Sequence, residues 1–215
     1  MSFRYVFAKY LKDPQSCPGL LFEDENVLII EDMYPKSLVH YLIIPKENTS
    51  KTPQEAFKDE QFIAKIQKYV DKASEMVLSK WSASYETPIS KQNIIVCCHS
   101  VPSLANLHIH VMTDDLCSNR LKNKKHYNSF ATPFAIKWTE FPLAADDPRH
   151  SPEHCNLLLK GDLIHNGINY RSSFRRLRQE LDRKRDTIVT NRKRRAAQDE
   201  ESGRKKANTL TSPPH

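Results

Sequence analysis

Apolar and polar residues follow two different periods along the chain, and each period predicts a type of element. Short runs rich in β-branched residues are expected to form strands, at residues 20–31, 39–45, 94–98 and 107–113. Between the second and third runs, residues 54–81 repeat apolar side chains at helical spacing, on a face made of Phe62, Ile66, Val70, Ala73 and Val77. A shorter helix over residues 2–11 should end at Asp13-Pro14. Strands, one long helix and further strands in this order predict an α+β fold with an antiparallel sheet.

The last of these runs carries the most unusual pattern. In NLHIHVM, residues 106–112, polar and apolar residues alternate strictly as far as Val111. Side chains two apart on a strand share a face, so Asn106, His108 and His110 should line one side while the apolar residues between them pack into the core. Two neighbouring imidazoles could be metal ligands with His99 as a third, structural groups, or a nucleophile with its partner. The pattern alone leaves these alternatives open.

Charge is distributed unevenly. Residues 1–159 contain 18 Lys and Arg against 19 Asp and Glu, whereas residues 160–215 contain 15 against 7. The net charge of +7 therefore belongs to the C-terminal quarter, and such a basic end favours a polyanionic partner, most simply nucleic acid. The clusters RLRQELDRKR and NRKRR could also be a nuclear address, so we expect the protein in the nucleus, with the cytoplasm as a second location.

Cysteine usage and hydropathy point to a reduced, intracellular protein. The five cysteines are odd in number, form no CxxC pair and follow no signal peptide. No apolar run reaches the roughly 18 residues that a transmembrane helix requires, so no membrane partner is expected.

Separated motifs resemble one family. NLHIHVM is similar to the signature of the histidine triad family, although Asn106 stands in the place of the first histidine. FEDENVLIIEDMYPKSLVHYLIIPKE, residues 22–47, looks like the nucleotide-binding half of that family. RLKNKKHYNSF, residues 120–130, resembles the aprataxin branch, the DNA-adenylate hydrolases, and HSVPSLANLHIH resembles the fungal aprataxin-like proteins in particular. The resemblance covers residues 2–142 and, more weakly, extends to about 184.

This resemblance implies removal of AMP from 5′-adenylated DNA, the product of an abortive ligation. His108 would attack the adenylyl phosphorus to give a covalent AMP-histidine, which water then cleaves. His110 would hydrogen-bond the phosphate oxygens, helped by the hydroxyl of Ser103. His99 would stand near the leaving 5′-phosphate as an imidazolium and protonate or stabilise it. Asn106 could orient its neighbours but cannot titrate, and the step needs no metal.

The resemblance also assigns the residues that would hold the nucleotide. Asp32 would accept hydrogen bonds from both ribose hydroxyls, and Asn106 is grouped with the same half of the site. Apolar contacts to adenine would come from Leu21, Ile30 and Met33. For the first two of these, core packing is an equal alternative. His40, inside a strand, either approaches the substrate or is a satisfied structural residue.

DNA contacts are expected on both sides of the catalytic strand. The loop after it carries a dense basic set, made of Lys122, Lys124, Lys125 and His126. We expect this set to contact phosphates, with Ser129 as a further donor, rather than to be an ordinary solvated face. Phe3 and Arg4 resemble the place where this branch stacks an aromatic residue on the exposed base pair, with core packing as the rival for Phe3. A second basic surface should come from Arg171, Arg175, Arg176 and Arg178.

The C-terminal part matches the shape of the family's zinc finger without its ligands. Zinc is expected for the family, but Leu163 and Asn166 fall where the two cysteines should be. Glu180 and Lys184 fall where the ligands on the helix should be. Leucine and protonated lysine do not bind Zn²⁺, so we expect a degenerate module without zinc that leans on the main domain or stays partly disordered.

The sequence thus divides into a histidine triad catalytic domain over residues 1–145, a degenerate zinc-finger-like module over 146–184 and a disordered basic tail over 185–215. The expected partner of this monomer is nicked or double-stranded DNA with a 5′-AMP end, the product is AMP, and no cofactor is required. Two other functions stay open. One is a hydrolase that uses His108 on small substrates such as AMP-lysine or dinucleotides. The other is a catalytically weak DNA-binding protein in which Asn106 marks lost activity.

Overall fold

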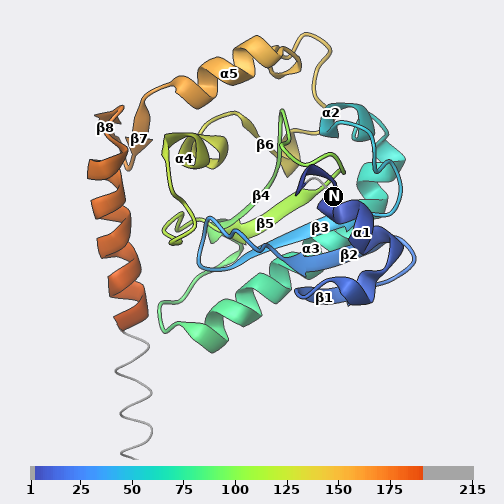
Figure 1. Cartoon of the computed structure of the whole chain (residues 1–215), viewed down its shortest axis with the longest axis horizontal. Coiled ribbons are helices and arrows are strands. Elements are labelled where there is room, and N and C mark those ends of the chain that lie inside the picture. The colour runs from blue at the N-terminus through green and yellow to red at the C-terminus, as the bar shows by residue number, and fades with distance from the viewer. Residues whose placement is uncertain (1–2, 191–215) are drawn as a thin grey trace, which may run out of the picture.

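The computed structural model describes residues 3–190, and its centre is an antiparallel sheet of six strands (Figure 1). In spatial order, the strands are β1 (Leu20–Glu23), β2 (Val27–Glu31), β3 (His40–Pro45), β5 (Ile109–Thr113), β4 (Ile94–His99) and β6 (Ala135–Lys137). The helices are α1 (Val6–Lys12), α2 (Pro53–Ala56), α3 (Glu60–Ser84), α4 (Lys124–Ala131) and α5 (Pro152–Lys160). Single 3₁₀ turns are η1 (Phe3–Tyr5), η2 (Pro14–Ser16), η3 (Lys91–Asn93), η4 (Trp138–Glu140) and η5 (Pro148–His150). The predicted α+β fold, with an antiparallel sheet and one long helix, is confirmed.

The two faces of the sheet are covered differently. On one face, α3 packs its predicted apolar stripe, including Phe62 and Ile66, against strand residues such as Ile43 and Ile109. On the other face, α1 places Phe7 over the same central strands. Because successive side chains of a strand point to opposite faces, the histidines of β3, β4 and β5 share the face that α3 does not cover.

Local side-chain caps account for the places where the elements differ from the expected ones. Residues 20–31 form a hairpin rather than one strand, because the Asp24 carboxylate accepts the N–H groups of Asn26 and Val27 at 2.8 and 3.0 Å and makes a turn. The long helix begins at Glu60 rather than at residue 54, because the Asp59 carboxylate caps its first turn.

The C-terminal part is a hairpin followed by a helix that packs along the domain (Figure 1). The hairpin consists of β7 (Leu163–His165) and β8 (Ile168–Arg171), and residues 174–190 are helical. Four apolar side chains of this part lie in one cluster with Cys117 and Leu121 of the main domain: Leu163, Tyr170, Leu177 and Leu181.

This helix continues through residue 190, whereas a disordered tail was expected from residue 185. The physical reason is Ile188, whose side chain is buried in the core on the α3 side of the sheet. The cluster NRKRR and the rest of the expected tail, residues 191–215, lie outside the described residues.

All five cysteines, Cys17, Cys97, Cys98, Cys117 and Cys155, are buried free thiols. Burial raises the pKa of each thiol, and that of Cys97 reaches about 12. Within residues 3–190, no helical segment combines the length and the apolar character that crossing a bilayer demands.

Candidate active site

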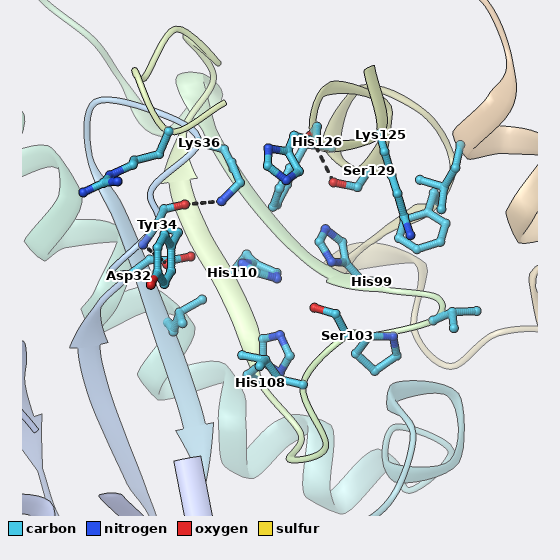
Figure 2. Close-up of a pocket in the computed structure, with 18 of the residues that line it drawn as sticks. Asp32, Tyr34, Lys36, His99, Ser103, His108, His110, Lys125, His126 and Ser129 are labelled. Atoms are coloured by element: carbon cyan, nitrogen blue, oxygen red, sulfur yellow. Dashed lines mark hydrogen bonds between the residues drawn. The ribbon is translucent and has the colours of Figure 1, made fainter. Parts of the chain in front are cut away.

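A cleft of about 1060 Å³ opens on the histidine-bearing face of the sheet, between α1 on one side and α4 and α5 on the other. Its lining includes ten of the residues predicted for the site: Ile30, Asp32, Met33, His99, Ser103, His108, His110, Lys122, Lys125 and His126, with Ser129 as an eleventh. Figure 2 shows His108, His110 and His99 across its floor, with Asp32 and Tyr34 to one side and Lys125 and His126 to the other. The structure therefore brings together residues from four distant segments of the sequence.

The hydrogen bonds of His108 determine which of its ring nitrogens is free. Its Nδ1 lies 2.8 Å from the main-chain carbonyl oxygen of Asn106, and a carbonyl can only accept, so Nδ1 carries the proton. Burial lowers the pKa of His108, so the ring is neutral and Nε2 keeps its lone pair. Asn106 thus orients His108 through its main-chain carbonyl, and the side-chain Oδ1 of Asn106 is buried without a hydrogen-bond partner.

A second chain of hydrogen bonds sets the state of His110. The backbone N–H of Lys36 donates to His40 Nδ1 at 3.1 Å, which places the proton of neutral His40 on Nε2. That Nε2 lies 2.9 Å from His110 Nδ1 and donates to it. The remaining proton of His110 is therefore on Nε2, a buried atom that has no partner. His40 is a satisfied structural residue that acts on the site through His110, and it does not line the cleft.

All of these imidazoles are uncharged near neutral pH. Burial lowers the pKa of His40 to about 4 and that of His99 to about 3, and it also holds the pKa of His110 well below its usual value. The imidazolium expected at His99 is therefore wrong for the protein without substrate. Since the Nε2 of His99 is also buried and unpartnered, both it and His110 leave an unmade hydrogen bond at the cleft floor.

The side of the cleft that was predicted to hold the nucleotide is lined by some of the predicted residues and by two others. Asp32 accepts the backbone N–H of Tyr34 at 2.7 Å, and its second oxygen lies 3.6 Å from His40 Nε2. Leu21 and Asn106 do not line the cleft. Lys36 and Tyr34, which sequence reasoning missed, do line it. Tyr34 and Lys36 lie in the DMYPKS turn, two and four residues after Asp32. Their closeness to Asp32 in the sequence could have indicated them.

The opposite rim is basic and begins with a helix where a loop was expected. Asn123 caps α4 by accepting the backbone N–H of His126 at 2.9 Å, which explains why the basic run becomes helical. Lys124 is not among the residues that line the cleft, and Ser129 donates its hydroxyl to the carbonyl of His126 at 3.0 Å.

Other predicted DNA contacts lie away from the cleft, and one cation on the side of the cleft that holds Tyr34 was missed. Arg4, Arg175 and Arg176 are exposed but do not line it, and the side chain of Phe3 is outside the described part. Arg120 lines the cleft, with its guanidinium carbon 5.7 Å from the centre of the Tyr34 ring. It is the first residue of the RLKNKKHYNSF motif, so the motif could have indicated it.

One group of side chains could geometrically hold a metal ion. Asp32, His40 and His110 offer ligand atoms within 4.8 Å of one another, and no other such group occurs among the described residues. However, His40 Nε2 and His110 Nδ1 already share a proton across 2.9 Å, so the arrangement fits a hydrogen-bond chain better than a cation. In the C-terminal module, Leu163 is fully buried among apolar side chains and offers no ligand.

The chain is similar in sequence to known proteins. Residues 4–126, more than half of the chain, match the family described as scavenger mRNA decapping enzyme C-term binding. An aprataxin-like protein of Saccharomyces cerevisiae is 34% identical over 66% of this chain and 76% of its own length. An aprataxin-like protein of Schizosaccharomyces pombe is 31% identical over 63% of this chain and 62% of its own length.

Solved structures of aprataxin orthologs have a fold similar to that of this chain. The crystal structure of the aprataxin ortholog Hnt3 in complex with DNA aligns with a TM-score of 0.71 at 29% identity, over 88% of this chain and all of that chain. Hnt3 in complex with DNA and guanosine aligns with a TM-score of 0.72 at 27% identity, over 87% of this chain. The fold and these likenesses lead to one conclusion: the chain belongs to the aprataxin-like branch of the histidine triad family.

Proposed function

We propose that this histidine triad hydrolase removes AMP from 5′-adenylated DNA ends through a covalent AMP-histidine at His108. The observation that carries the proposal is the state of His108: its Nδ1 proton is held by the Asn106 carbonyl, so an unprotonated Nε2 remains for nucleophilic attack. Asp32 stands on one side of this nitrogen and the basic rim on the other, as an adenylate joined to DNA requires.

In the first step, His108 Nε2 forms a bond to the adenylyl phosphorus. The bond that breaks joins this phosphorus to the bridging oxygen, and the electron pair leaves with the 5′-phosphate of the DNA. The imidazole becomes positively charged as the P–N bond forms, and the Asn106 carbonyl stabilises that charge through Nδ1–H. In the second step, water attacks the same phosphorus, the P–N bond breaks, and His108 regains its lone pair while the water proton passes to solvent.

His110 and His99 provide the hydrogen bonds that the phosphate oxygens need. The proton on His110 Nε2 has no partner in the protein, so a non-bridging oxygen can accept it without displacing an existing bond. His99, 4.6 Å from His110 between ring centres, is neutral and would face the leaving phosphate. Because the departing 5′-phosphate is stable as an anion, it needs no proton from His99. Ser103 would add its hydroxyl from the loop between β4 and β5.

The nucleotide would lie between Asp32, as the ribose acceptor, and the apolar surface of Ile30 and Met33. Met33 is exposed, with 53% of its surface accessible, so it is available for a base. For Leu21, which does not line the cleft, core packing is the better interpretation.

The basic rim favours DNA over a small substrate. Lys122, Lys125 and Arg120 line the cleft beside the histidines, and a substrate such as AMP-lysine would leave these cations without a partner. We assign DNA phosphates to them, and we propose that Phe3, Arg4, Lys124, Arg175 and Arg176 extend the contact beyond the cleft.

The same proposal covers the organisation of the chain. The catalytic domain would span residues 1–145, followed by a zinc-finger-like module that has lost its zinc and then by the basic tail. The protein would act as a monomer in the nucleus, and catalysis would require no metal.

The test is release of AMP from a nicked duplex whose adenylyl phosphorus is radiolabelled, with a chelator present and no added metal. Wild type and His108→Asn are compared, with His154→Asn as the matched control because His154 lies outside the cleft. Quenching in alkali, which preserves phosphoramidates, should leave label on the wild-type protein and none on His108→Asn. Release by both variants would refute the role of His108. Binding of the duplex without any release would leave a DNA-binding protein, and cleavage of AMP-lysine alone would leave a small-substrate hydrolase.

A further inference from the structure

The segment between β5 and α4 brings two cations into the cleft. We call residues 116–123 the rim loop; it contributes Arg120 and Lys122 to the cleft lining. Its internal hydrogen bonds are few, among them Leu121 N–H to the Ser118 carbonyl at 3.0 Å and Arg120 N–H to the Ser118 hydroxyl at 3.1 Å. The position of the two cations therefore also depends on contacts outside the loop. Ser118 N–H donates to the Lys36 carbonyl at 3.3 Å, Lys122 N–H donates to His126 Nδ1 at 3.1 Å, and the C-terminal helix holds the loop from behind.

Arg178 of the C-terminal helix holds the rim loop through its main chain. One guanidinium nitrogen donates to the carbonyls of Ser118 and Leu121 at 2.8 and 3.2 Å, and the other terminal nitrogen donates to the carbonyl of Cys117 at 3.1 Å. The Asp182 carboxylate, one turn along the helix, accepts from Nε at 3.0 Å and from the second terminal nitrogen. The planar guanidinium can reach these separate acceptors at once because its donors are fixed in a fork.

These bonds leave Arg178 with nothing to offer a phosphate. A guanidinium has five N–H donors, and the five hydrogen bonds above use all of them. The side chain is also 18% exposed, whereas Arg175 and Arg176 on the same helix are exposed. The expectation that Arg178 belongs to a DNA-facing surface is therefore wrong, and its contacts are with the protein.

Apolar packing places the same helix and loop together. Cys117 and Leu121 of the rim loop are fully buried, in the cluster that contains Leu177 and Leu181 of the helix. Arg185 adds a further contact, since its guanidinium donates to the side-chain oxygen of Asn119. The helix therefore holds the loop in two ways: Arg178 donates to backbone carbonyls of the loop, and apolar side chains of the helix pack against buried side chains of the loop.

We propose that Arg178 is a positioning residue for the substrate site: it sets the rim loop so that Arg120 and Lys122 meet the DNA phosphates. The inference rests on the proposed function, and it gives the C-terminal helix a task in the active site that requires no zinc. The helix then serves substrate binding through the loop, and the chemistry at His108 is unaffected by it.

The first test compares Arg178→Ala and Arg178→Lys with Arg183→Ala, a matched control on the same helix. The side chain of Arg183 is 76% exposed and pairs with Glu180. Loss of Arg178 should raise KM for the adenylated duplex about tenfold while kcat stays within about twofold. Arg178→Lys keeps the charge but should not restore KM, because a single ammonium nitrogen would have to replace the two guanidinium nitrogens that donate to the carbonyls of Cys117, Ser118 and Leu121. Full rescue by lysine, or an unchanged KM in Arg178→Ala, would overturn the proposal.

A double-mutant cycle with Arg120→Ala separates positioning from direct DNA contact. If Arg178 acts through the loop, Arg120→Ala should weaken binding much less in the Arg178→Ala background than in wild type. Additive effects would mean that Arg178 acts independently of Arg120 and would sink the inference. Should wild type release no AMP, the Kd for the duplex replaces KM in the same cycle, so the two proposals fail separately.

Hydrogen exchange tests the structural step without any substrate. Amides of residues 116–123 should exchange faster in Arg178→Ala and Arg178→Lys than in wild type, and Arg183→Ala should leave them unchanged. Unchanged exchange in this segment would contradict the proposed support of the loop.

Discussion

Replacing Leu163 by alanine tests whether the C-terminal module is held by apolar packing. In the proposed zinc-finger-like module, Leu163 takes the place of a cysteine ligand, and it is 0% exposed. It lies in one cluster with Leu177 and Leu181 of the C-terminal helix and with Leu121 of the rim loop. If packing has replaced a metal here, the free energy of unfolding should depend strongly on this side chain.

The magnitude follows from the burial. A fully buried Leu→Ala change removes the transfer free energy of the side chain and leaves a cavity, for a loss of about 2–5 kcal/mol. For a protein of this size, each kcal/mol lowers Tm by about 2–4 °C, so a loss of 3 kcal/mol corresponds to about 6–12 °C. The matched control is Leu157→Ala in the same module, whose side chain is 66% exposed. It should change stability by no more than about 0.5 kcal/mol.

The assay is urea unfolding followed by circular dichroism and by tryptophan fluorescence. Trp81 and Trp138 both lie in the core on the α3 side of the sheet, so fluorescence reports the main domain while circular dichroism also reports the C-terminal helix. We expect the two probes to coincide for wild type, and a chelator to leave the midpoint unchanged. Equal, small losses in Leu163→Ala and Leu157→Ala, or a wild-type midpoint that falls with the chelator, would refute the reasoning.

The remaining predictions concern the histidines and one ion pair. Because the pKa of folded His40 is about 4 against an ordinary value of 6.5, the unfolded chain gains the proton first, so stability should be full above about pH 6.5 and decline as pH falls to about 4, in urea midpoints measured across that range. Replacing His40 by phenylalanine removes the donor to His110 and should lower kcat about 10- to 100-fold with little change in KM; an unchanged kcat would contradict the hydrogen-bond chain. Arg149 pairs with Asp147 at 2.7 Å and holds the pKa of that carboxyl at about 2, so this contribution is present above about pH 3.8 and lost as pH falls to about 2; Arg149→Met should flatten the acid limb of the stability profile.

The alternating pattern around the catalytic strand was predictable because it depends only on local geometry. In a strand with one buried face, the register that buries Leu107, Ile109 and Val111 also forces His108 and His110 to the other face. The stripe of α3 could be read for the same reason, since helical spacing alone decides which residues share a side.

The features that were missed depend on contacts between distant segments. The neutral state of His99 follows from burial beside Phe130 and Phe134, which come from another part of the chain. Arg178 points to the protein because it donates to backbone carbonyls about 60 residues earlier in the chain. The sequence around Arg178 does not indicate these partners. The capping role of Asn123 could have been predicted, because asparagine is a preferred N-cap residue and Asn123 directly precedes the helix that starts at Lys124.

The five buried thiols allow local opening of the structure to be measured by their reaction with a thiol reagent. A thiol reagent reacts with the thiolate at an accessible sulfur, so a buried cysteine of raised pKa is modified only when its surroundings open. Each region holds its own probe: Cys17 lies beneath α1, Cys97 and Cys98 lie in β4, Cys117 lies in the rim loop, and Cys155 lies in α5. The labelling rates, separated by mass spectrometry, would therefore rank the opening free energies of the cleft walls, the sheet and the loop in one experiment on the unaltered chain.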